Sequence, residues 1–155
     1  MKKIDLGQTI TILANVGVIA GIVFLGYELR QNQVVVQAQT RNEITRMFVD
    51  TMRADISSEM IEILTRTQNG EDLDDFDERR VGIWADIWLT LFENLDYHSR
   101  EGLYQQEEYE AQYRELDAWI NSTDTLFRDR FCEYRFEYTV SFQDVIDSML
   151  ERPCD

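Results

Sequence analysis

The sequence predicts an all-α protein in which an N-terminal transmembrane helix continues into a compact bundle of about five helices. Three observations predict this class: an uncharged apolar stretch near the start, apolar residues that recur every three to four positions afterwards, and no convincing strand pattern. We expect a short basic tail at residues 1–9, the transmembrane helix at 10–29 and an acidic helical domain at 30–155.

The stretch between Asp5 and Glu28 carries no charge and is rich in Ile, Val and Leu. A helix of about 20 such residues matches the roughly 30 Å hydrocarbon core of a bilayer. A cleavable signal peptide and a buried core helix are the alternatives. No A-x-A cleavage site follows the stretch, and it is apolar on every face instead of along one stripe. The sequence therefore predicts a retained single-pass anchor.

Small residues in this stretch predict contact with another helix. Gly17 and Gly21 form a GxxxG motif, Ala14 and Gly26 add small residues, and Asn15 needs a hydrogen-bond partner in lipid. Small residues let helix backbones approach closely, and an interhelical amide bond adds about 1 kcal/mol. We expect Ala14, Asn15, Gly17 and Gly21 to form an oligomer contact, and a lone anchor is the alternative.

The helical domain is expected to begin as a direct continuation of the anchor, because neither Gly nor Pro interrupts residues 31–54. Ser57 then offers an N-cap for a helix over residues 58–68, which an Asn-Gly pair ends. The acidic run 71–78 lacks the glycine and the ligand register of a calcium loop. We interpret it as the acidic start of the next helix.

The strongest amphipathic pattern lies in residues 78–102, which a glycine closes. Its apolar side consists of Val81, Trp84, Trp88, Leu91, Phe92 and Leu95. We expect this segment to be the core helix. Further helical segments are predicted over 107–121 and 127–138, and Ser141 is expected to cap a last helix over 142–150.

Four charged residues spaced by seven follow one face of the predicted core helix: Arg79, Asp86, Glu93 and Arg100. Such a stripe forms a buried ion network, a carboxylate site or the solvated back of an amphipathic helix. We favour the structural or solvated role. In a functional site Glu93 would be the group of interest, because a desolvated carboxylate is able to transfer protons.

Metal and cofactor chemistry is not indicated. The only histidine, His98, excludes a multi-histidine metal site, and the chain has no Glu-x-x-His pair, P-loop, GxGxxG or GxSxG motif. We therefore expect no metal, no cofactor and no enzymatic activity.

Acidic residues outnumber basic ones by 30 to 15, which gives a net charge of −15. A surface with this charge repels nucleic-acid phosphates and disfavours direct docking on anionic lipid head groups. The expected partners are therefore the membrane lipid bilayer, which takes up the anchor, and a second copy or another membrane protein, but no nucleic acid.

The side of the membrane that the domain faces stays open. Cys132 and Cys154 are able to form one disulfide in an oxidising compartment, and two unrelated thiols are the alternative. The positive-inside rule nearly ties, because two lysines before the span oppose three arginines within about 20 residues after it. These cations are Lys2 and Lys3 before the span and Arg30, Arg41 and Arg46 after it.

A resemblance to other proteins covers most of the chain in order. It rests on three segments: GYELRQN, IWLTLFENLDYHSREGLY and YEAQYRELDAWIN. With them the chain resembles a loose group of uncharacterised small single-pass membrane proteins of Gram-negative bacteria. The resemblance implies a bacterial inner-membrane location and a cytoplasmic domain, since such proteins carry arginine just after the span and few cations before it. Lys2 and Lys3 depart from that pattern. The resemblance implies no activity.

The first hypothesis for function is a membrane-anchored helical module that self-associates or serves as an accessory subunit of a membrane assembly. An oligomeric pore or transport subunit is the second, with Asn15 facing a lumen and Glu28 at its mouth. A small ligand-binding sensor or enzyme is the third. It would use the charged stripe and would require a concave pocket beside it.

Overall fold

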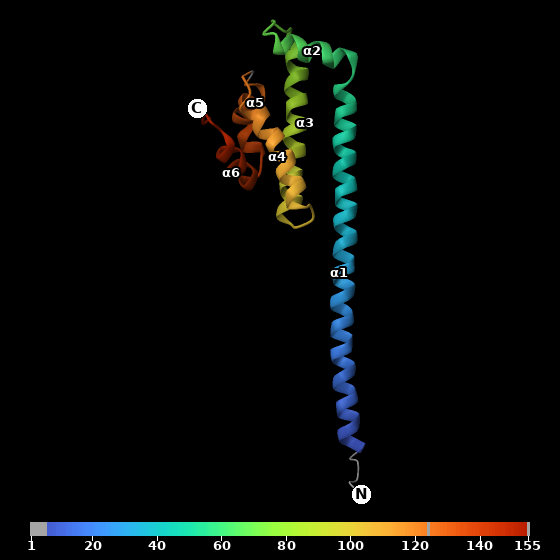
Figure 1. The fold of residues 1–155 in the computed structure, drawn as a ribbon. Coiled ribbons are helices and arrows are strands. Elements are labelled where there is room, and N and C mark those ends of the chain that lie inside the picture. The colour runs from blue at the N-terminus through green and yellow to red at the C-terminus, as the bar shows by residue number, and fades with distance from the viewer. Residues whose placement is uncertain (1–5, 124, 155) are drawn as a thin grey trace. The chain divides into compact units, whose positions relative to one another are not determined.

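A computed structural model, shown in Figure 1, describes residues 6–123 and 125–154. The chain forms two compact units, Met1–Gln39 and Thr40–Asp155, and helix α1 (Leu6–Asp55) contributes residues to both. Lys2 and Lys3 of the predicted basic tail lie outside the described residues. Helix α1 already begins at Leu6, within the range predicted for that tail.

The second unit contains the last part of α1 and a series of shorter helices. These are α2 (Ser58–Gln68), α3 (Asp75–Arg100), α4 (Gln106–Ile120), α5 (Leu126–Tyr134), the 3₁₀ turn η1 (Arg135–Glu137) and α6 (Val140–Met149). Every regular element among the described residues is helical, which confirms the predicted all-α class. Figure 1 shows α2 crossing from the end of α1 to the start of α3.

Local capping explains where the first helices of this unit start and stop. The Ser57 hydroxyl accepts a hydrogen bond from the Met60 amide at 3.3 Å and starts α2, as predicted. The Asp74 carboxylate accepts from the amides of Phe76 and Asp77 at 3.0 and 2.8 Å and starts α3. The acidic run is therefore a helix start, because negative charge is favourable at a helix N-terminus.

Glycines follow the ends of α2 and α3, as the sequence predicts. Gly70 and Gly102 have φ angles of +69° and +68°, in the left-handed region that glycine adopts without a steric penalty. Both helices end because the backbone adopts this left-handed conformation at the glycine, and the chain turns there.

Helix α3 lies at the centre of the unit and packs mainly against α4 and α5. The core consists of Ile44 and Phe48 of α1, Ala85, Trp88, Leu89, Leu91, Phe92 and Leu95 of α3, Tyr113, Leu116 and Ile120 of α4, Phe127 and Phe131 of α5, and Phe142 and Ile146 of α6. Five of the six residues predicted for the apolar side of the core helix are buried, and Trp84 is partly buried.

The last helix begins two residues earlier than predicted. Thr139, not Ser141, occupies the N-cap position of α6, and Ser141 lies in its first turn. The Thr139 backbone amide donates a 2.7 Å hydrogen bond to the carboxylate of Glu93 on α3. The predicted cap was wrong because a carboxylate from another helix satisfies the backbone at this position.

Candidate functional site

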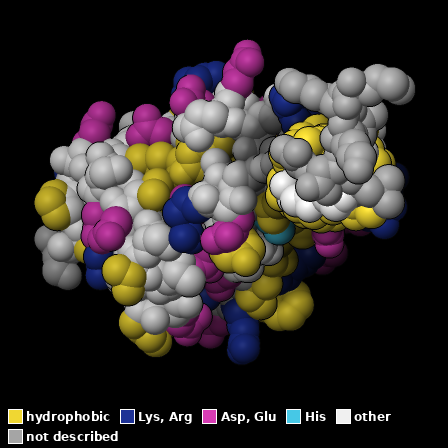
Figure 2. Space-filling view, turned by 90° about the horizontal axis from the view of Figure 1, so that it is seen from below, with side chains coloured by type: hydrophobic (Ala, Val, Ile, Leu, Met, Phe, Trp, Pro, Cys, Tyr) yellow, Lys and Arg dark blue, Asp and Glu magenta, His cyan; other side chains and the backbone are white. Residues whose placement is uncertain are grey.

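Among the described residues, one helix is long and apolar enough to cross a membrane, and it is α1. None of its most apolar window is buried in the structure. Val18, Val23 and Phe24 are 63, 67 and 60% exposed, although they lie about 100 to 140° apart around the helix. Figure 2 looks along α1 from its N-terminal end and shows hydrophobic side chains around it. The predicted span is therefore one continuous apolar helix, and its most apolar part is exposed.

Helix geometry divides the four residues predicted for the oligomer contact. At 3.6 residues per turn, Ala14, Gly17 and Gly21 lie within about 60° of one another. Asn15 lies about 120° from Gly21, on a different face that includes Gly26. Apart from neighbouring residues of the helix itself, a Cβ atom added at Gly17, Gly21 or Gly26 would meet no atom of the described residues within 4 Å. The small-residue face of Ala14, Gly17 and Gly21 is thus open for another helix.

The charged stripe of α3 does not form one site. Asp86 makes a bidentate ion pair with Arg130 of α5, with both N–O distances at 2.6 Å. Gly82 makes room for this pair, because a Cβ there would lie 3.4 Å from the Arg130 guanidinium carbon. The guanidinium carbon of Arg130 also lies 4.0 Å from the centroid of the Tyr134 ring. The hydrogen bonds to the Asp86 carboxylate raise the pKa of the Arg130 guanidinium above its usual value.

The other members of the stripe have separate contacts. Glu93 holds the start of α6, as described above, and Arg100 donates to Asp96 at 2.8 Å. Arg79 is exposed. Arg79 lines a hollow of 490 Å³ on one part of the surface, whereas Glu93 and Arg100 line another of 280 Å³. Asp86 and Glu93 therefore tie α3 to α5 and to the start of α6, and the stripe does not face a single pocket.

The sequence reasoning missed a buried polar cluster around Asp96, which is 1% exposed. Its carboxylate accepts from Arg100 and, at 3.1 Å, from the Tyr109 hydroxyl. The Tyr113 hydroxyl donates to the Phe92 carbonyl at 3.4 Å. The i,i+4 spacing of Asp96 and Arg100 could have indicated this pair.

Burial fixes the protonation of these tyrosines. It raises the pKa of Tyr109 to about 12 and raises the pKa of Tyr113 well above its usual value. Both hydroxyls therefore stay protonated near neutral pH and act as hydrogen-bond donors. The cluster therefore links α3 and α4 through hydrogen bonds to a buried carboxylate.

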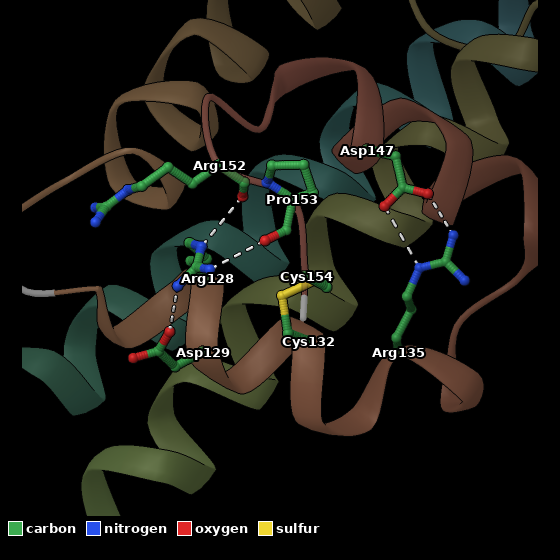
Figure 3. Close-up of a disulfide and its surroundings, with 8 residues drawn as sticks. All are labelled: Arg128, Asp129, Cys132, Arg135, Asp147, Arg152, Pro153 and Cys154. Atoms are coloured by element: carbon green, nitrogen blue, oxygen red, sulfur yellow. Dashed lines mark hydrogen bonds and ion pairs between the residues drawn. A yellow bond between two sulfur atoms is a disulfide. The ribbon is translucent and has the colours of Figure 1, made fainter.

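The structure joins Cys132 of α5 to Cys154 of the C-terminal segment by a disulfide, with the two Cα atoms 5.4 Å apart (Figure 3). Beside this bond, the Arg128 guanidinium donates to the carbonyls of Arg152 and Pro153 at 3.2 and 3.1 Å. The last residues of the described chain are therefore fastened to α5 by a covalent bond and two hydrogen bonds.

Further contacts hold the same end of the chain. The Asn121 side chain donates to the Met149 carbonyl at 3.0 Å and accepts from the Glu151 amide at 3.1 Å. Arg135 pairs with Asp147 of α6, as Figure 3 also shows. In residues 6–123 and 125–154, no three His, Cys, Asp or Glu side chains converge as metal ligands.

These features define a class: an all-α protein with an acidic, disulfide-bonded helical unit and one helix long and apolar enough to cross a membrane. The chain matches no protein-family model, no curated protein and no solved structure. Function is therefore inferred from the geometry of the chain itself.

Proposed function

We propose that this chain is a membrane-tethered, non-enzymatic helical module that self-associates through α1 as part of a membrane assembly. The observation that carries the proposal is the open small-residue face of Ala14, Gly17 and Gly21 on a fully exposed apolar helix. Continuous apolar surface of this kind is unfavourable in water and favourable in lipid. Insertion into lipid removes the unfavourable exposure of the apolar side chains to water. A second copy of α1 then packs on the face of Ala14, Gly17 and Gly21, where the two backbones are able to approach closely.

The disulfide supports a location of the helical unit on the oxidising side of a bacterial inner membrane. Disulfides persist in the periplasm and are rare in the cytosol. Lys2 and Lys3 then lie on the cytoplasmic side and Arg30, Arg41 and Arg46 outside, so the positive-inside rule does not decide between the two orientations. This orientation differs from the cytoplasmic domain that the family resemblance implies, and the disulfide is the reason for preferring it.

Helix geometry disfavours the alternative of a pore. A lumen lined by Asn15 with Glu28 at its mouth requires both side chains on one face of α1. At 3.6 residues per turn they lie about 140° apart around the axis. Glu28 instead follows the face of Gly21, about 20° away.

Replacing both Gly17 and Gly21 by isoleucine is expected to reduce the particle in detergent to one chain of 18.4 kDa. The bulky side chains keep the helix backbones apart, and there is open space at the Cβ position of both glycines. Light scattering coupled to gel filtration, corrected for bound detergent, measures the mass.

Gly26→Ile is the matched control, because Gly26 is equally open but lies about 140° from Gly21. It should leave the mass unchanged. The proposal fails if the double variant keeps the parent mass, or if Gly26→Ile disperses the particle equally well.

A further inference from the structure

Asp55, the last residue of α1, holds a carboxylate that two tryptophans share. The indole N–H groups of Trp84 and Trp88 donate to its two oxygens at 2.5 and 3.1 Å. Both donors are neutral, so they stabilise the anion without cancelling its charge. Each carboxylate oxygen has a further lone pair for another donor.

The position of Asp55 makes its surroundings more negative. The C-terminus of a helix carries a partial negative charge, since the last backbone carbonyls have no partner within the helix. An acid is unfavourable there unless a cation or hydrogen-bond donors stabilise it. The two indoles supply donors, and the site still attracts a positive charge.

A cavity of 420 Å³ lies beside this carboxylate. Its apolar walls come from Met60, Ile83, Trp84 and Ile87. The volume is within the range of small-molecule pockets, roughly 300 to 1,000 Å³, and near its lower end. The cavity therefore has room for a ligand of about the size of one aromatic ring with a short chain.

The remaining charges that line the cavity are matched by neighbours. Arg80 pairs with Glu59 at 2.6 Å, and Asp50 pairs with Arg53 at 3.2 Å. Asp55, whose described partners are the two indoles, leaves an uncompensated negative charge at the wall. An anionic ligand would be repelled, and a neutral donor would form a weaker hydrogen bond than a cation and would leave the charge uncompensated.

We propose that this cavity binds an organic ammonium whose N–H groups reach Asp55 and whose hydrocarbon part lies against Ile83, Ile87 and Trp84. The ammonium would form a charge-assisted hydrogen bond with the carboxylate and a favourable contact with the indole face. This site is independent of self-association through α1, since its walls come from the end of α1, from α2 and from α3.

The test uses the full chain in nanodiscs of zwitterionic lipid, with ¹⁵N-labelled tryptophan. Phenethylamine is the probe, and 2-phenylethanol is its neutral counterpart of the same shape. The indole N–H signals of Trp84 and Trp88, which donate to Asp55, should shift saturably with the amine, whereas that of Trp119, which neither lines the cavity nor donates to Asp55, should not. The alcohol should bind at least tenfold more weakly.

Two variants separate charge from shape. Asp55→Asn should weaken amine binding at least tenfold, while Glu62→Gln, an equal loss of charge at an exposed position outside the cavity, should change it less than twofold. Ile83→Lys places an ammonium in the cavity from a residue that is 48% exposed, and it should abolish binding without unfolding the chain. Equal affinity for amine and alcohol, or amine binding that survives Ile83→Lys, would overturn the proposal.

Discussion

Replacing Phe92 by alanine is expected to lower the free energy of unfolding by about 3 to 5 kcal/mol. Phe92 is fully buried, and the centroids of four other aromatic rings lie 5.7 to 6.3 Å from the centroid of its ring. Removing the ring leaves a cavity that these large neighbours, held by α1, α3 and α4, fill only in part. Denaturant titration of the detergent-solubilised chain, followed by near-ultraviolet circular dichroism, measures the loss.

The control is Phe136→Ala, the same chemical change at a residue that is 78% exposed. It should alter the free energy of unfolding by no more than about 0.5 kcal/mol. A loss below about 1 kcal/mol for Phe92→Ala, or equal losses for both variants, would contradict the packing described for α3.

Removing the disulfide by Cys132→Ser is expected to cost about 3 kcal/mol of stability. The bond closes a loop with a sequence separation of 22, and its loss frees many conformations of the unfolded chain. The hydrogen bonds from Arg128 and Asn121 remain, so the C-terminal segment should loosen without unfolding α3. The midpoint of denaturation measures the change.

Cys154→Ser should cost the same as Cys132→Ser, and reductant should destabilise the parent chain but neither variant. Protein taken from cells under acid quench should carry no alkylatable thiol. Free thiols in that sample, or a midpoint that reductant leaves unchanged, would contradict both the bond and the oxidising location proposed for the helical unit.

The features predicted correctly from the sequence are those that neighbouring residues determine. Ser57 caps α2 three residues away. The acidic run does lead into α3, although the helix begins at Asp75, three residues before the predicted amphipathic pattern, with Asp74 as its cap. Gly70 and Gly102 end helices through their own backbone angles. The period of apolar residues in α3 identifies its buried side, because that side must face the rest of the domain.

The features that were missed depend on partners far along the chain. Asp86 and Arg130 are separated by 44 positions, and Asp55 and Trp84 by 29. A stripe at intervals of seven cannot show that Asp86 contacts α5 while Arg100 pairs within α3 itself. Likewise, Glu93 accepts from the backbone amide of the Thr139 N-cap from 46 positions away. Spacing within one helix identifies a face but not what covers it.

The central claim is that the apolar part of α1, residues 10–29, lies in lipid, and fractionation of cells that express the chain tests it most directly. Membranes are collected by ultracentrifugation and washed in alkaline carbonate, and intact mass spectrometry follows the full-length chain. We expect the uncleaved chain of 18.4 kDa in the washed pellet, with release only by detergent. An uncleaved chain that stays in the supernatant and is monodisperse without detergent would contradict the claim.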